Sequence, residues 1–114
     1  MEPHIVSTKV PVDTPVGGEM VIFRSSRGAR LHDPPKVQVG QRVILQGQGH
    51  AEGEVLSVQP HVPFRDIHDA DIRDSYYEET RTRESLLRCL QGMYAESGYD
   101  EDTPTTVIRC RRTA

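Results

Sequence analysis

Three arginines lie close together in the first third of the chain, where a predicted strand gives way to a loop. Arg24 ends the strand, Ser25 follows it, and Arg27 and Arg30 come next in the loop. Guanidinium groups form planar forks that fit phosphate oxygens, and hydroxyl and backbone N–H groups offer further donors. Lys9, on the preceding predicted strand, adds a fifth polar side chain. The sequence therefore predicts a local basic rim that can bind phosphate.

Two residues from later in the chain extend this candidate site. Tyr76 precedes the main predicted helix, where its ring can stack on a base as aromatic residues do in proteins that read single-stranded RNA. Arg109 lies among the arginines of the last predicted strand. The candidate nucleic-acid-binding residues are thus Lys9, Arg24, Ser25, Arg27, Arg30, Tyr76 and Arg109.

Each of these residues also has an ordinary structural role open to it. Arg24 can pair with Glu19 or Glu54, and Tyr76 can pack beneath the helix. The arginines near the end of the chain can balance the acidic segment at 66–79. That segment is also the candidate surface for a protein partner. The residue pattern alone leaves these alternatives open.

No metal-binding or cofactor-binding motif stands out in the sequence. The histidines of the predicted loops lack the spacing of a zinc site. The glycines around Gln48 lack the lysine and the following helix of a phosphate loop, so they predict a hairpin turn. The aspartates between residues 69 and 74 resemble a calcium loop in spacing, but Arg73 occupies a ligand position. We expect no metal and no cofactor.

Length and composition limit both architecture and partners. With 114 residues, 35% of them hydrophobic, the chain predicts one domain over residues 1–114. The net charge is −3, and segment 66–104 has four basic against eleven acidic residues, so a nucleic-acid site must be local. There is no apolar run of ~18 residues and no signal-peptide pattern, which predicts a cytoplasmic protein without membrane contact. Cys89 and Cys110 have apolar neighbours and are expected to be reduced core cysteines.

The elements that must position these residues follow from the hydrophobic pattern. Strands are expected over 4–10 and 20–24, a hairpin over 39–45 and 53–59, and a closing strand over 105–111. Short helical turns are expected within 66–79. A helix is expected from Thr82, because apolar residues recur with helical spacing at Leu86, Leu87, Leu90, Met93 and Tyr94.

This order of elements predicts an α+β fold, a small β-barrel with one main amphipathic helix laid against it. Ile108 and Cys110 are expected to point into the barrel. Leu86, Leu90 and Met93 are expected to cover one of its ends. The cleft between helix and barrel is the expected site of function.

The same segments resemble a known family, the ASCH domain of the PUA-like superfamily of β-barrels. The likeness covers residues 5–112. It rests on Gly40 and on the segments 42–45 (RVIL), 53–55 (GEV), 64–67 (FRDI), 86–94 and 106–109 (TVIR). The resemblance implies a PUA-like barrel that binds RNA or a nucleotide in the cleft.

The chain departs from the catalytic pattern of this family. Relatives that resemble acetylcytidine amidohydrolases use a lysine and a threonine on the second strand with a glutamate on a following helical segment. Here Glu19, Met20 and Ile22 occupy the lysine, threonine and polar positions, whereas Arg24 matches. Lys9 is a candidate replacement for the lysine. The sequence thus favours a binding module without amidohydrolase activity, with a nucleoside- or RNA-processing hydrolase and a protein-interaction module as alternatives.

Overall fold

The computed structural model describes residues 1–28 and 32–114, which form a small α+β fold. All predicted strands and the main helix are present, with their ends shifted by a few residues. The elements of the described residues are β1 (His4–Thr8), β2 (Glu19–Ser25), β3 (Arg42–Gly47), β4 (His50–Pro63), the 3-10 helix η1 (Phe64–Asp66), α1 (Asp69–Arg73), the 3-10 helix η2 (Glu78–Thr80), α2 (Arg83–Met93) and β5 (Pro104–Arg112).

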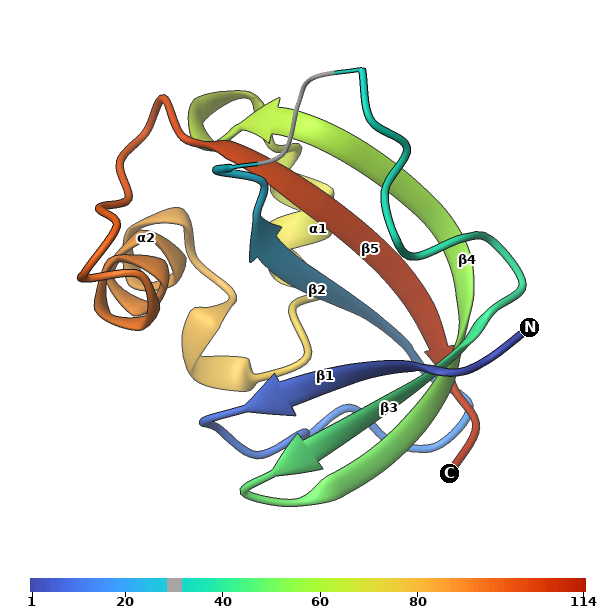
Figure 1. Cartoon of the computed structure of the whole chain (residues 1–114). Coiled ribbons are helices and arrows are strands. Elements are labelled where there is room, and N and C mark those ends of the chain that lie inside the picture. Colours follow the sequence, from blue (N-terminus) through green and yellow to red (C-terminus); the bar gives the residue numbers. More distant parts are fainter. Residues whose placement is uncertain (29–31) are drawn as a thin grey trace.

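The strands form one curled sheet, a half-barrel, in the order β1, β3, β4, β5, β2 (Figure 1). β1 runs parallel to β3, and the other neighbours are antiparallel. The long strand β4 pairs with both β3 and β5, and its register with β5 shifts between Val55 and Ser57 and again between Gln59 and Val62. Extra residues at such bulges bend and twist a strand. β4 therefore carries much of the curl.

The free edge of β2 is continued by the chain that follows α1. Val21 forms a parallel bridge with Ser75; its N–H donates to the carbonyl of Asp74 (2.8 Å), and its own carbonyl accepts from the Tyr76 N–H (3.2 Å). The carbonyl of Tyr76 accepts in turn from the N–H of Asp13 (3.1 Å). Backbone hydrogen bonds thus fix Tyr76 beside the half-barrel.

Two apolar cores lie on opposite faces of β2, because successive side chains of a strand point to opposite faces. Ile22 belongs to the core inside the half-barrel, together with Ile108 and Cys110, as predicted for the last two. Val21 and Phe23 belong to a second core on the outer face. Both cysteines are free.

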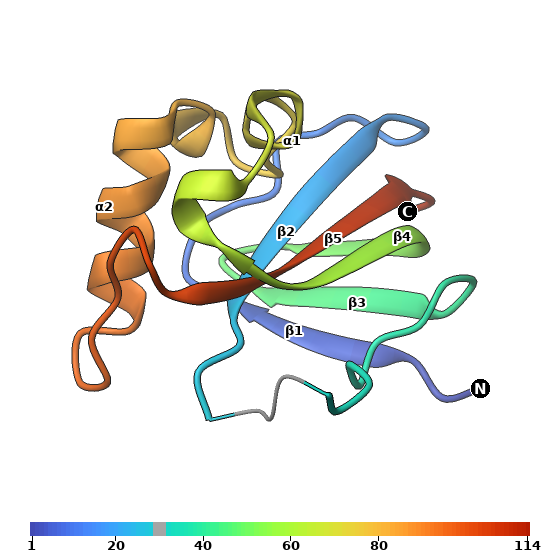
Figure 2. The same cartoon turned by 90° about the horizontal axis from the view of Figure 1, so that it is seen from above.

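Helix α2 forms the other wall of this second core and lies beside β2 (Figure 2). Its Leu86 and Leu90 are buried there, and Met93 packs against them. The expectation that these residues cover an end of the barrel is therefore wrong. A helical stripe of leucines shows which face of a helix is buried, but not which face of a sheet covers it. Within the described residues, no helix is long and apolar enough to span a membrane.

Arg109 of β5 ties the segment after α1 to the sheet. Its guanidinium donates to Asp71 (2.7 Å), Asp74 (2.8 Å) and Glu19 (3.2 Å). Burial alone would lower the pKa of Arg109, but the hydrogen bonds to these three carboxylates outweigh it and raise that pKa above its ordinary value. Arg109 therefore has a structural role and is withdrawn from the basic rim that the sequence predicts.

We predict that Arg109→Ala destabilises the fold by on the order of 3 kcal/mol. The loss leaves Asp71, which is only 8% exposed, without its charged partner, and breaking one side of a buried ion pair has a cost of this size. Urea denaturation measures the change. Arg111→Ala, at an exposed position on the same strand, is the control and should stay within about 0.5 kcal/mol of the wild type. Equal stabilities of the two variants would contradict the assigned role of Arg109.

Candidate functional site

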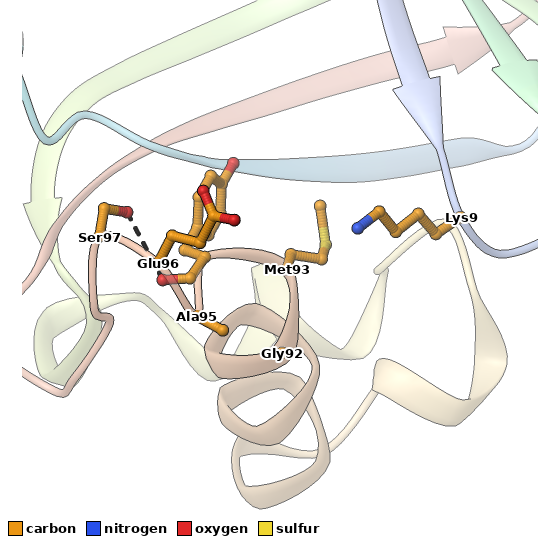
Figure 3. Close-up of a pocket in the computed structure, with 7 residues that line it drawn as sticks. Lys9, Gly92, Met93, Ala95, Glu96 and Ser97 are labelled. Atoms are coloured by element: carbon orange, nitrogen blue, oxygen red, sulfur yellow. Dashed lines mark hydrogen bonds between the residues drawn. The ribbon is translucent and has the colours of Figure 1, made fainter.

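A pocket of about 520 Å³ opens between the residue that follows β1 and the C-terminal end of α2. We call it the helix cleft; it is lined by Lys9 and residues 92–97. The side chain of Lys9 extends toward Met93, and Glu96 and Ser97 lie farther along the same wall (Figure 3). The cleft predicted between helix and barrel is therefore present, and Lys9 lies in it.

Tyr94 connects the helix cleft to the end of β2. Its hydroxyl accepts a hydrogen bond from the Ser25 N–H (3.1 Å), and its ring stacks on Tyr99 with centroids 5.9 Å apart and planes 24° apart. The Tyr99 hydroxyl shares a 2.6 Å hydrogen bond with Thr105 of β5. The stacked rings hold the end of α2 against β2, which places Ser25 at the edge of the cleft.

Arg24 lies on the face of β2 that points into the half-barrel, one alternation beyond Ile22. It is half-buried, and it forms no ion pair with any residue that the structure describes. In particular it is not paired with Glu19, which is bound to Arg109 instead, nor with Glu54. A guanidinium without a carboxylate partner can form a planar fork to the oxygens of an anion, so Arg24 is the strongest ligand-binding candidate among the described residues of the predicted set.

Tyr76 is close enough to Arg24 for the two to interact electrostatically. Burial, with smaller contributions from Cys89 and Tyr94, raises the pKa of Tyr76 to about 12, although the charge of Arg24 acts to lower it. The phenol is therefore neutral at physiological pH. Part of the ring packs on the core of the half-barrel, so both the structural and the binding role considered for Tyr76 remain.

Arg27 has a structural task that the sequence did not reveal. Its guanidinium donates to the carbonyl of Ser97 (2.7 Å) and to the hydroxyl of Thr103 (3.3 Å), which braces the loop after β2 against the loop after α2. The backbone N–H of Arg27 donates to the Ser25 hydroxyl (3.2 Å). Arg30 lies outside the described residues. Of the predicted set, Lys9 lines the helix cleft, Ser25 binds Tyr94 of the cleft wall, and Tyr76 interacts electrostatically with Arg24 and Tyr94.

Two further residues near Arg24 were missed by sequence reasoning. His4 is half-buried, and burial lowers its pKa, with smaller contributions in the same direction from the charges of Arg24 and Lys36. His4 is therefore neutral at physiological pH. Lys36, like Lys9, forms no ion pair with a described residue. The one available signal was that His4 alternates with Val6 and Thr8, whose side chains are buried. Arg24 and Lys36, which both lie close to His4, are called the cationic group below.

The acidic segment 66–79 is partly neutralised within the chain. Asp69 pairs with Arg83 (2.7 Å), while Asp71 and Asp74 bind Arg109. The pKa of Asp69 is lowered, chiefly by its hydrogen bond from Arg83. The balancing role considered for the arginines near the chain end is thus present for Arg109.

Comparisons with known proteins give information about the fold alone. No model of a known protein family matches the chain, and no curated protein sequence matches it. The chain is similar to a solved structure, "Crystal structure of protein EF3133 from Enterococcus faecalis V583, family-model DUF984", with a TM-score of 0.56 and 14% sequence identity. The match covers 85% of this chain and 63% of that one, so the chain spans less than two thirds of its structural neighbour.

The burial of Tyr76 predicts a loss of stability at alkaline pH. The phenol has a pKa of about 12 in the folded protein against 10.0 in the unfolded chain, so its contribution is complete below pH 10 and is lost as the pH rises toward 12. Tyr76→Phe should reduce the fall in the free energy of unfolding between pH 9 and about 11.5. Urea denaturation across this range measures it. Identical pH profiles for the variant and the wild type would show that Tyr76 is solvated.

Proposed function

We propose that this chain binds single-stranded RNA or a nucleotide at the helix cleft and the cationic group. The observation that carries the proposal is Arg24, a half-buried cation beside Tyr76 that no described carboxylate neutralises. A phosphate can supply the missing negative charge, and the exposed part of the Tyr76 ring can contact a base. Lys9 and Lys36 add two mobile cations without ion pairs among the described residues.

The proposal also covers the family to which the fold belongs. We infer that the half-barrel is a PUA-like barrel of the ASCH type, because the residues that carry the resemblance fall on β3, β4, α2 and β5 in the expected order. The structural neighbour supports the arrangement of elements and carries no statement about ligands. An RNA ligand also agrees with the cytoplasmic location that the sequence predicts.

Salt dependence is the direct test of phosphate binding. With two or three phosphate contacts from Lys9, Arg24 and Lys36, log affinity for a single-stranded RNA should fall with log salt with a slope of about −1.4 to −2.1, from ~0.7 per contact. Arg24→Gln should flatten the slope by about 0.7 and weaken binding. Fluorescence anisotropy with a labelled oligonucleotide measures both.

The matched control is Arg88→Gln, since Arg88 is exposed on α2 and lies 4.0 Å from Glu84. This variant should bind as the wild type does, with an unchanged slope. The proposal fails if the wild type binds neither RNA nor nucleotide at low salt, or if Arg24→Gln and Arg88→Gln behave alike. A protein partner at segment 66–79 would then become the leading hypothesis.

A hydrolase remains the second candidate because Lys9 and Glu96 line the same cleft. Amide hydrolysis needs an activated nucleophile and a group that transfers the proton. β2 has Glu19 and Met20 where the family's hydrolases have lysine and threonine. We predict no release of acetate from acetylcytidine. Acetate release by the wild type that Lys9→Ala abolishes would overturn this prediction and would identify Lys9 as the displaced lysine.

A further inference from the structure

His61 occupies a strained position in β4. Its φ is 56°, in the left-handed region, and no other non-glycine residue that the structure describes has a positive φ. It lies in the second bulge of the strand, between the paired residues Gln59 and Val62. Residues other than glycine rarely adopt this conformation, and such outliers concentrate at ligand-binding sites.

The imidazole of His61 has an unsatisfied polar atom. Its Nδ1 is buried, and no residue that the structure describes forms a hydrogen bond with it. Buried polar groups in folded proteins are nearly always hydrogen-bonded. Strain and a missing partner thus coincide in one side chain, and neither is explained by the packing of the fold.

This side chain lines a pocket of about 470 Å³ on the loop that leads to β3. The loop pocket, as we call it, is lined by Gly28, Asp33, Pro34, Pro35, Lys36 and His61. The two proline rings give this pocket apolar walls, and a few hydrogen-bonding groups complete its lining. Pockets that hold a heterocycle have this combination of apolar walls with few, specific polar groups.

The loop pocket is a short distance from the helix cleft. Ser25 binds Tyr94 of the cleft, whereas Gly28 lines the loop pocket. These two residues are three positions apart in the chain. Their Cα atoms are therefore at most about 11 Å apart, at 3.8 Å between consecutive Cα atoms. Arg24 precedes this segment, and its charge acts both on Tyr76 and on His4, which also senses Lys36 of the loop pocket. Arg24 and Lys36 of the loop pocket thus both lie close to His4.

We propose that the loop pocket receives one base of a single strand, with the neighbouring phosphate at Arg24 and Lys36, so that the ligand is a short single-stranded RNA and not a free mononucleotide. The inference rests on the proposed function, which it narrows to one class of ligand. The base contacts the proline rings and the imidazole ring of His61, which turns so that its buried Nδ1 meets the edge of the base. The strand then continues past Arg24 into the helix cleft.

The test compares two substitutions at one position. His61→Gly removes the ring and also the strain, because glycine adopts positive φ freely, whereas His61→Ala removes the ring alone. Binding of a mixed-sequence single-stranded hexanucleotide and of uridine monophosphate is measured by calorimetry at low salt. His50→Ala, at an exposed position at the start of β4, serves as the control.

Both His61 variants should bind the hexanucleotide about tenfold more weakly, the effect of losing contact with one base. Uridine monophosphate, which cannot reach from the loop pocket to the helix cleft, should bind the wild type more weakly than the hexanucleotide does, and His61→Gly should melt at or above the wild-type temperature. The inference is overturned if the wild type binds the hexanucleotide and His61→Gly binds it equally well, or if His61→Gly melts clearly lower, which would make His61 structural. If the wild type binds neither probe, the proposed function itself fails.

Discussion

The hydrogen bonds of Arg109 with Asp71, Asp74 and Glu19 are the interaction on which the candidate site depends. They join β5, the start of β2 and the segment after α1, which are far apart in the chain, at one place. Because Asp74 and Ser75 are held there, Tyr76 must lie along the edge of β2. Glu19 begins β2, whereas Arg24 lies near its end and on the opposite face, so Glu19 does not neutralise Arg24.

Electrostatic balance therefore differs between the two ends of β2. At its start, one guanidinium meets three carboxylates. At its end, Arg24 lies with His4 and Lys36 and has no acidic partner among the described residues. Because the chain has a net charge of −3, it can bind a polyanion only at a place where basic side chains are separated from acidic ones. The fold achieves this separation by holding Arg109 and its three carboxylates near the start of β2, while Arg24 lies at the end of that strand.

Local patterns predicted the elements, and long-range contacts decided the roles of the arginines. The apolar periodicity of α2 and the glycine-bounded runs of β3 and β4 located those elements because burial sets their period. The contacts of Arg109 and Arg27 within the fold could not be predicted, because their partners lie up to 90 and 76 residues away, where spacing carries no information. His61 looked like one of several loop histidines, since backbone strain leaves no mark on the sequence.

The most direct measurement of the central claim is the Nε–H spectrum of the arginines during titration with a single-stranded hexanucleotide, recorded by ¹H–¹⁵N NMR. Single substitutions assign the Nε–H signals to residues. The signals of Arg24, Arg109 and Arg27 are then followed separately in one sample. We predict that the Arg24 signal shifts as the RNA saturates the protein. The Arg109 signal should stay in place, because the donors of Arg109 are engaged by carboxylates. A stationary Arg24 signal at saturating RNA would contradict it.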